Sequence, residues 1–318
     1  MNGVSLHDLA PSQRSAREEV LRGLRSPQKE LPCKLLYDEV GSELFEQICA
    51  LDEYYPTRAE MRIMRASCAE MATCLGPGAL LIEYGSGSST KTRLLLDHLE
   101  RPAGYVPIDI SREQLRQSAA AIAAAYPGLE VLPVVADYTA AFQIPRPRQP
   151  VARRVAYYPG STIGNFVPDD ARRFLARLAQ VCGPEGGLLI GVDLKKDPLM
   201  LHRAYNDALG ITAEFNLNVL TRLNRELDAT FAVDQFRHYA FYNPVFARIE
   251  MHLVSLVDQE VRVAGDQIRF VRGESIWTEA SYKYNPDDFA ELAAAAGWRA
   301  EQVWMDDRGL FSVQYLER

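Results

Sequence analysis

A glycine-rich segment between a predicted strand and a predicted helix has residues suited to holding a nucleotide-containing ligand. It reads Glu83-Tyr84-Gly85-Ser86-Gly87-Ser88-Ser89-Thr90-Lys91. Glycines allow a tight turn and a close approach of the backbone to a ligand, and a helix start offers free N–H groups. An ordinary strand-to-helix turn is the alternative interpretation. NAD and ATP are disfavoured, because Thr90 replaces the third glycine of a dinucleotide fold and the P-loop pattern is missing.

Two aspartates are predicted at the ends of the strands that follow. Asp109 closes the second strand, roughly 20 residues after Gly87, where a Rossmann-like fold uses a carboxylate to accept hydrogen bonds from ribose hydroxyls. Asp137 closes the third strand in the same way. One strand-end aspartate is often only a helix cap or a turn former. A glycine turn followed by two such acids instead describes an adenosine site.

The Glu-x-Gly-x-Gly turn with its strand-end acids resembles the class I S-adenosylmethionine-dependent methyltransferases over roughly residues 80–193. That resemblance implies an α/β fold with a Rossmann-like sheet, an added discontinuous substrate-binding domain, and S-adenosyl-L-methionine as the cofactor. Four more segments occur in order towards the C-terminus: Lys34–Asp38, Glu53–Arg58, Gly160–Asn165 and Thr278–Tyr284. Together they resemble the histidine-specific S-adenosylmethionine-dependent methyltransferases.

This family resemblance implies an N-methyltransferase that converts L-histidine by three successive methyl transfers to the betaine hercynine. That reaction is the first step of ergothioneine biosynthesis. The transfer would be an in-line displacement at the sulfonium methyl group, which requires a neutral, aligned amine rather than a strong base. By the same resemblance, Tyr37 and Asn165 are the catalytic residues, and Tyr37 or a water accepts the amine proton.

The resemblance also implies binding roles, residue by residue. The substrate-binding set is Tyr54, Asn165, Tyr205, Met251, Glu279 and Ser281. The cofactor-binding set is Gly85, Ser86, Gly87, Lys91, Asp109 and Asp137. Glu279 and Ser281 resemble the imidazole-binding pair. Lys91 resembles the residue that meets the methionine carboxylate of the cofactor, and Tyr205 the one that holds the substrate carboxylate.

Geometry alone supports two of these implied roles. Asn165 follows the fourth predicted strand, at the carboxyl edge where open α/β sheets bind ligands. Glu279 and Ser281 stand at alternate positions, so an extended segment points both side chains to one face, where they can satisfy both ring nitrogens of an imidazole. The alternatives are a solvent-facing strand for this pair and core packing for Tyr54 and Tyr55.

The other reactive residue types suggest no further chemistry. The five histidines and five cysteines are scattered, without metal-ligand or Cys-x-x-Cys spacing. We therefore expect no metal site, zinc knuckle or disulfide framework, and we interpret the cysteines as buried or incidental thiols. The segment around Gly160 and Ser161 lacks the second glycine of a serine nucleophile elbow.

Short apolar runs alternate with stretches of helical period from Leu80 onward, which indicates a parallel sheet covered by helices. The expected strands are Leu80–Tyr84, Tyr105–Ile108, Val131–Val135, Val155–Tyr158 and Gly187–Val192. The helices expected between them are Lys91–Glu100, Arg112–Ala125 and Pro168–Val181. The tail is expected to complete the sheet with a helix and two strands, Pro286–Ala296, Arg299–Met305 and Gly309–Tyr315.

A second module interrupts this alternation. The segment before Leu80 is helical in pattern and has no strong strand. After Asp193, the pattern predicts two helices and an antiparallel hairpin: Pro198–Leu209, Ala213–Leu227, and strands at 247–257 and 261–271. We expect residues 59–195 and 284–318 to form the methyltransferase domain, and residues 7–58 and 196–283 to form the substrate-binding domain.

Composition limits the partners that this chain can have. Its 318 residues are 47% hydrophobic, and 35 Lys+Arg against 42 Asp+Glu give a net charge of −7, the wrong sign for nucleic acid. Apolar runs are far shorter than the roughly 20 residues that cross a bilayer. The first 15 residues lack the apolar run of a secretion signal. We expect a cytoplasmic protein with L-histidine as its small-molecule partner, no nucleic acid, no membrane and no obligate protein partner.

Two other functions stay open on this evidence. One is Nα-methylation of a different amine, such as an aromatic amino acid or a thiolated histidine. The other is a non-catalytic regulator that binds S-adenosylmethionine. Incubation with the cofactor and a panel of amino acids, followed by mass measurement, distinguishes the three possibilities.

Overall fold

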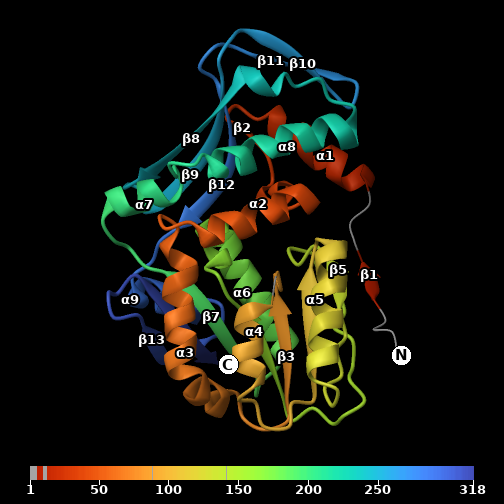
Figure 1. Cartoon of the computed structure of the whole chain (residues 1–318), viewed down its shortest axis with the longest axis vertical. Coiled ribbons are helices and arrows are strands. Elements are labelled where there is room, and N and C mark those ends of the chain that lie inside the picture. The colour runs from red at the N-terminus through yellow and green to blue at the C-terminus, as the bar shows by residue number, and fades with distance from the viewer. Residues whose placement is uncertain (1–5, 10–12, 88, 141) are drawn as a thin grey trace. The chain divides into compact units, whose positions relative to one another are not determined.

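The computed structural model describes residues 6–9, 13–87, 89–140 and 142–318, which divide into two compact units. The first unit contains the described parts of residues 1–10, 56–195 and 282–318, and the second contains those of residues 11–55 and 196–281. Figure 1 labels their helices and strands. One expectation was wrong: β1 (His7–Leu9) belongs to the first unit and not to the substrate-binding domain, because it pairs in parallel with β5 (Val134–Ala136).

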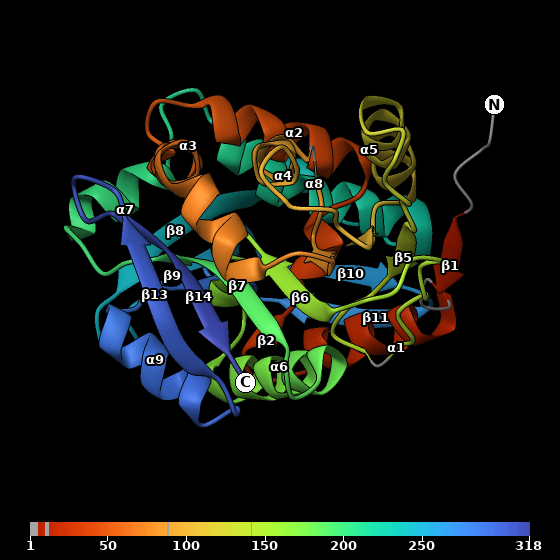
Figure 2. The same cartoon turned by 90° about the horizontal axis from the view of Figure 1, so that it is seen from below.

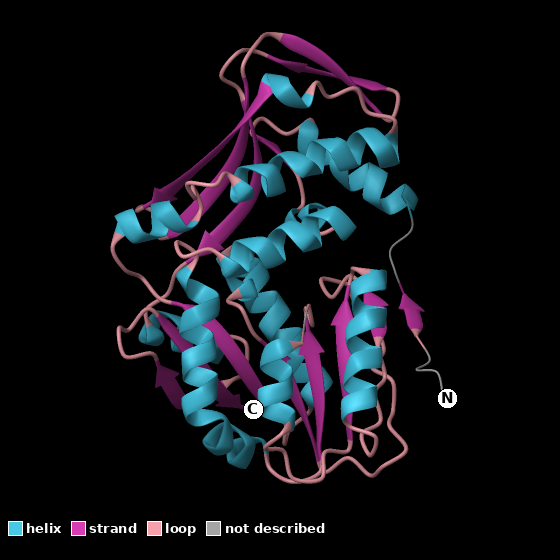
Figure 3. Cartoon of the chain, viewed as in Figure 1, coloured by secondary structure: helices cyan, strands magenta, loops and turns pink. Residues whose placement is uncertain are grey.

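An eight-stranded sheet forms the centre of the first unit, in the order β1-β5-β4-β3-β6-β7-β14-β13 (Figure 3). Its other strands are β3 (Ala79–Tyr84), β4 (Gly104–Asp109), β6 (Arg153–Tyr158), β7 (Gly187–Asp193), β13 (Arg299–Met305) and β14 (Phe311–Glu317). The pairs from β1 to β7 are parallel, whereas β14 runs antiparallel to both β7 and β13. The predicted α/β class with its parallel core and closing strand pair is confirmed.

Helices cover both faces of this sheet. They are α3 (Tyr55–Leu75), α4 (Thr90–Leu96), α5 (Arg112–Ala125), α6 (Pro168–Cys182) and α9 (Pro286–Ala294). Figure 2 shows α3, α4 and α5 on one face and α6 and α9 on the other. Every residue of β3 and β7 is buried, as the nearly continuous apolar sequences of these strands require. Helix α4 ends earlier than predicted, at Leu96.

The parallel strands bring several segments to one edge of the sheet. The residues that follow β3, β4, β5 and β6 all leave the sheet at its carboxyl edge. These segments contain the glycine turn, Asp137 and Asn165, and Asp109 is the last residue of β4 at the same edge. This is the edge at which open α/β sheets bind their ligands.

The second unit is built on a four-stranded sheet in the order β2-β12-β9-β8. These strands are β2 (Lys29–Glu30), β8 (Phe236–Asn243), β9 (Arg248–Ser255) and β12 (Ser275–Tyr282). The helical elements of the unit are α1 (Gln13–Leu24), η1 (Cys33–Leu36), α2 (Glu39–Ala50), α7 (Pro198–Ala204), α8 (Ile211–Leu227) and η3 (Val233–Gln235). Helix α8 contacts α2, β8 and β9, and its buried residues include Phe215, Val219, Leu220 and Leu223.

The hairpin predicted from residues 247–257 and 261–271 was wrong. β9 pairs instead with β8, which the sequence analysis missed. The second predicted strand is split, because Ala264 and Gly265 form a two-residue turn between β10 (Gln259–Val263) and β11 (Asp266–Phe270). Both halves alternate buried and exposed residues, but Val261 and Val263 are buried in β10 whereas Ile268 and Phe270 are buried in β11, so the alternation changes phase at the turn.

Helix α7 is shorter than predicted and ends at Ala204. The chain then turns, because the Asp207 carboxylate accepts hydrogen bonds from the backbone N–H groups of Ile211 and Thr212, each at 2.9 Å. Those groups belong to the first turn of α8, so Asp207 satisfies donors that a helix start otherwise leaves unpaired. The turn leaves Tyr205 directly after α7.

None of the helices in the described parts of the chain is both long enough and apolar enough to cross a membrane.

Candidate functional site

The glycine turn follows β3 directly and has a backbone that favours glycine. Gly85 and Gly87 have φ values of +76° and +44°, in the left-handed region. A Cβ built on either residue would meet no atom within 4 Å, so the backbone here borders open space. The hydroxyl of Ser86 is buried and has no hydrogen-bond partner among the described residues. Ser88 lies outside the described residues.

Asp109 ties this turn to the neighbouring strand. Its carboxylate accepts a hydrogen bond from the N–H of Gly87 at 3.3 Å and another from the N–H of Ser111 at 2.9 Å. Burial raises the pKa of Asp109, and these backbone hydrogen bonds counteract the shift. Asp137 follows β5, and its carboxylate accepts hydrogen bonds from both the N–H and the hydroxyl of Thr139.

The buried carboxyl group of Glu83 connects the elements on either side of the glycine turn. Glu83, only 1% exposed, accepts hydrogen bonds from the hydroxyls of Thr92 and Tyr105, both completely buried. Burial raises the pKa of Glu83 to about 7, although the two hydroxyl groups and Lys91 act in the opposite direction. Thr92 lies in α4 and Tyr105 in β4, so Glu83 joins the elements on either side of the turn.

Lys91, in the first turn of α4, pairs with a carboxylate that the sequence analysis did not single out. Its Nζ lies 2.5 Å from Oε2 of Glu60, a residue of α3. Glu60 also accepts hydrogen bonds from the N–H of Gly160, at 2.9 and 3.0 Å from its two oxygens. Nothing in the motif spacing distinguishes Glu60 from the other acids of a charged helix.

Asn165 is placed by a short turn after β6. It is the last residue of η2 (Thr162–Asn165), which begins after Ser161, a residue in the left-handed conformation at φ +59°. The hydroxyl of Ser161 accepts a hydrogen bond from the N–H of Asp193 at 2.9 Å, which fixes the turn against the end of β7. The side-chain amide of Asn165 is half-buried and makes no hydrogen bond to another described residue.

The second unit joins two of the predicted substrate residues directly. Tyr205, after α7, donates a hydrogen bond from its hydroxyl to Oγ of Ser281 at 2.8 Å. Ser281 and Glu279 stand at alternate positions of β12, and their side chains are 5% and 9% exposed. The solvent-facing alternative for this pair is wrong, because both side chains are buried.

Aromatic rings extend from this polar pair. The ring of Tyr54 lies 6.2 Å from that of Tyr205 and 6.2 Å from that of Phe45, between centroids. The ring of Tyr37 contacts Phe45 at 5.5 Å and Phe215 at 5.4 Å. The structure therefore brings Tyr37, Tyr54, Tyr205 and Ser281 into one chain of contacts, in which the sequence analysis missed Phe45 and Phe215.

Glu279 lies near the same cluster, and its charge is one of the factors that raise the pKa of Tyr54, after burial as the main cause. Met251 is connected less directly. Its side chain is 1% exposed, and its carbonyl accepts a hydrogen bond from the Thr278 hydroxyl at 3.1 Å. The same Thr278 hydroxyl lies 2.7 Å from Oδ1 of Asn216 in α8, so its one proton is shared between the two acceptors. The contacts place Met251 next to β12 without showing its thioether in the cluster.

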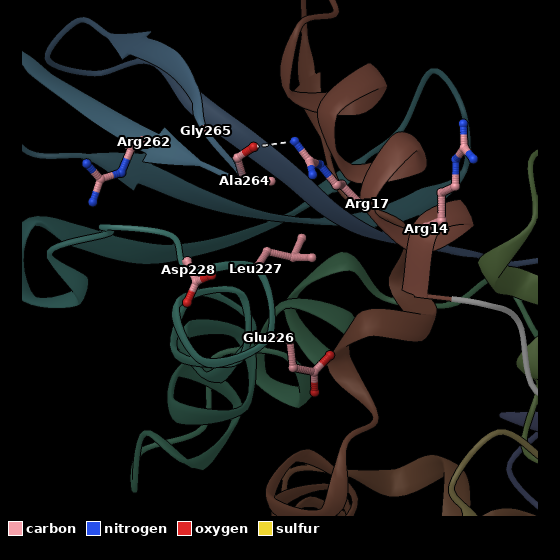
Figure 4. A pocket seen from close by; sticks show the side chains of 8 residues that line it. All are labelled: Arg14, Arg17, Glu226, Leu227, Asp228, Arg262, Ala264 and Gly265. Carbon is pink, nitrogen blue, oxygen red and sulfur yellow. Dashed lines mark hydrogen bonds between the residues drawn. The ribbon is translucent and has the colours of Figure 1, made fainter.

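A pocket of about 420 Å³ also lies in the second unit, and none of the predicted site residues lines it. Figure 4 shows Arg14, Arg17 and Arg262 around it, with Arg17 bonded to the Ala264 carbonyl. Within the described residues, no group of three or more His, Cys, Asp or Glu side chains is arranged to hold a metal ion.

Comparison with known proteins gives these features a context. Residues 16–318 match the family model described as "Histidine-specific methyltransferase, SAM-dependent". The chain belongs to this family. It is 43% identical over 308 residues to a protein of Mycolicibacterium smegmatis named "Histidine N-alpha-methyltransferase", covering 95% of this chain and 94% of that one.

Two further relatives agree with the family assignment. A protein of Mycobacterium tuberculosis with the same name is 44% identical over 303 residues, covering 93% of both chains. The "Ergothioneine biosynthesis protein 1" of Neurospora crassa is 33% identical over 294 residues, covering 87% of this chain and 32% of that longer one. This histidine-specific methyltransferase is therefore an enzyme that uses S-adenosylmethionine.

The first unit of the methyltransferase has features that fit this cofactor. The glycine turn borders open space, and within the described residues its buried Ser86 hydroxyl has no partner. Asp109 and Asp137 stand at the ends of neighbouring strands, where carboxylates accept hydrogen bonds from ribose hydroxyls in Rossmann-like folds. Lys91 supplies a cation close to the turn.

Proposed function

We propose that this enzyme transfers three methyl groups in succession to the α-amine of L-histidine, yielding hercynine, as the first step of ergothioneine biosynthesis. The observation that supports it best is the buried pair of Glu279 and Ser281 on β12, with Ser281 bonded to Tyr205. The names of the mycobacterial and Neurospora relatives agree with the same reaction. The cytoplasm is the proposed location, on the grounds of sequence given above.

The imidazole ring would be recognised by the Glu279 and Ser281 side chains. A carboxylate accepts a hydrogen bond from a ring N–H, and a hydroxyl can serve the other ring nitrogen. Both side chains are buried, so a ligand ring without polar atoms would leave the carboxylate desolvated and poorly paired. In this proposal, that penalty selects imidazole over phenyl, and indole, which has an N–H group but no acceptor nitrogen, leaves the Ser281 hydroxyl without a ring partner.

The rest of the amino acid would be held by tyrosines and an amide. Tyr205 would bind the substrate carboxylate by exchanging its hydrogen bond to Ser281 for one to the ligand. Tyr54 would form a wall of the pocket, and Met251 would limit the space for the side chain. Tyr37, with its ring held edge-on by Phe45 and Phe215, would act at the amine. Fixed rings of this kind orient a ligand at a low cost in entropy.

Bound S-adenosylmethionine supplies an activated methyl group on a sulfonium, so the protein needs no strong base. The chain must instead keep the amine neutral and aligned. In our proposal, the ammonium proton leaves to solvent through the Tyr37 hydroxyl or a water, and the Asn165 amide orients the nitrogen lone pair. The turn at Gly85 to Gly87, Asp109, Asp137 and Lys91 would hold the methyl donor.

A time course with histidine and excess S-adenosylmethionine tests the number of transfers. Mass spectrometry should show monomethyl and dimethyl histidine as transient species and the trimethylated product at the end. A reaction that stops after one methyl group would rule out the betaine product and leave the N-methyltransferase assignment in place.

A further inference from the structure

Glu60 of α3 holds two separate parts of the first unit at once. Its carboxylate pairs with Nζ of Lys91 at 2.5 Å, next to the glycine turn. Its two oxygens also accept the N–H of Gly160 at 2.9 and 3.0 Å. The side chain is only 1% exposed, while Lys91 is 23% exposed. The carboxylate therefore lies inside the fold and reaches a lysine that is open to solvent or ligand.

The Glu60 carboxylate packs against a glycine of strand β7. A Cβ built on Gly191, inside β7, would lie 2.4 Å from Oε1 of Glu60 and 3.1 Å from the N atom of Gly160. Any side chain at Gly191 would displace both. A glycine within a strand often marks a close approach of this kind. Gly191 thus provides the room that brings Glu60 to Gly160.

The contact between Glu60 and Gly160 also affects the position of Asn165. Gly160 has φ +77°, and Ser161 follows it at φ +59°. Both belong to the turn that starts η2, and η2 ends at Asn165. Since the N–H of Gly160 bonds to Glu60, the same carboxylate that pairs with Lys91 also fixes the start of the segment ending at Asn165.

A buried carboxylate is costly, and an ion pair with a partly exposed lysine contributes little to stability. We propose that Glu60 is a positioning residue of the methyl-transfer reaction. It orients the Lys91 ammonium towards the cofactor carboxylate and holds the Gly160–Asn165 segment at a fixed place for the substrate amine. This inference rests on the proposed function for the roles of Lys91 and Asn165.

Two substitutions separate these two contacts. Glu60→Gln keeps one oxygen for the N–H of Gly160, but its amide NH₂ faces the Lys91 ammonium, donor to donor. Glu60→Ala removes both contacts. Glu70→Gln is the matched control, because Glu70 lies on the same helix and accepts a hydrogen bond from Trp304 Nε1 at 2.8 Å, in a contact that involves neither Lys91 nor Gly160.

The first measurement is calorimetric binding of S-adenosylhomocysteine, which does not depend on the amino acid substrate. Glu60→Gln should weaken binding about tenfold, the worth of one charge-assisted hydrogen bond, and Glu70→Gln should not. At saturating cofactor, kcat of Glu60→Gln should stay within about threefold of wild type, whereas Glu60→Ala should lose at least tenfold in kcat because the Asn165 segment is released.

A double variant checks that Glu60 acts through Lys91. In the background of Lys91→Met, Glu60→Gln should add little further loss of binding, since coupled residues are non-additive. If Glu60 only stabilised the fold, its substitution would lower the unfolding midpoint and leave the affinity for S-adenosylhomocysteine unchanged. That result, or equal losses of kcat in Glu60→Gln and Glu60→Ala, would overturn the proposal. If wild type binds S-adenosylhomocysteine but leaves histidine unmethylated, the proposed function fails and the binding test of Glu60 still decides its own question.

Discussion

The hydroxyl of Tyr205 donates a hydrogen bond to Oγ of Ser281, with 2.8 Å between the two oxygens. Both residues are buried, Tyr205 after α7 and Ser281 on β12. The bond fixes the phenol, because a tyrosine hydroxyl in an aromatic cluster needs a polar partner. In the proposed function it also directs a residue for the substrate carboxylate towards a residue for the imidazole ring.

Removal of this hydroxyl should therefore weaken substrate binding without stopping chemistry. Tyr205→Phe is expected to raise KM for histidine by about tenfold, the worth of one or two hydrogen bonds, with kcat changed much less. Steady-state kinetics measure both constants. Tyr239→Phe is the control, because Tyr239 is 51% exposed on β8. An unchanged KM in Tyr205→Phe would remove this hydroxyl from the substrate site.

Asp109 should be needed for cofactor binding in two ways. Its carboxylate holds the N–H of Gly87 and, in our proposal, accepts the ribose hydroxyls. Asp109→Ala should cost roughly 2–4 kcal/mol in binding of S-adenosylmethionine. Calorimetry on folded protein decides the matter. Asp97→Ala, which removes only a contact to the Tyr126 hydroxyl, should bind normally. A folded Asp109→Ala variant with an unaltered dissociation constant contradicts the assignment.

Glu83 should make the stability of the protein depend on pH. Burial raises its pKa to about 7, above an ordinary value of 4.5, so the folded state binds more protons than the unfolded state between these values. Stability should then fall as pH rises from about 5 to 8, by roughly 3 kcal/mol from this one group. Below this pH range the carboxyl group is protonated in both the folded and the unfolded state, so it no longer makes the free energy of unfolding depend on pH.

Denaturant unfolding at a series of pH values checks this prediction. The Glu83→Gln variant cannot ionise, so its free energy of unfolding should lose the Glu83-dependent part of the slope. Its side-chain oxygen can still accept a hydrogen bond from Tyr105, and its NH₂ can donate to Thr92. Parallel curves for wild type and Glu83→Gln over the whole range would show that the carboxyl group titrates normally.

Much of the first unit could be predicted from sequence, because strands buried on both faces have continuous apolar sequences. The run from Gly187 to Val192 is an example, and the helical period of residues 112–125 likewise predicted α5. The second unit was harder. Its β8 reads Phe-Arg-His-Tyr-Ala-Phe-Tyr-Asn, without a regular alternation of polar and apolar residues. The turn at Ala264 and Gly265 splits a segment that was predicted as one strand.

The candidate site divides in the same way. Residues in motifs, such as Gly85 and Asp109, can be predicted because they are glycines in a turn or acids at the end of a predicted strand. Glu60 does not, because its role depends on a contact with Gly160, far away in sequence, and on the absence of a side chain at Gly191. Such a relation exists only after the chain has folded.

Glu279 should determine which amino acid the enzyme prefers. Glu279→Ala removes the proposed acceptor for the imidazole N–H and should reduce kcat/KM for histidine at least 100-fold, about 2.7 kcal/mol. It should also ease the entry of bulkier aromatic amino acids, and truncation of Met251 should widen the space further. If histidine turnover survives this substitution, the imidazole-binding role of Glu279 is wrong.

The most direct test of the account is a competition assay with the wild-type enzyme. Histidine, tryptophan and tyrosine are supplied together at equal concentration with excess S-adenosylmethionine, and the products are identified by mass. We expect trimethylated histidine to form first and to predominate, because of the three rings only imidazole has both an N–H group for Glu279 and an acceptor nitrogen for Ser281. Preferential methylation of tryptophan or tyrosine, or histidine recovered without methyl groups, would contradict it.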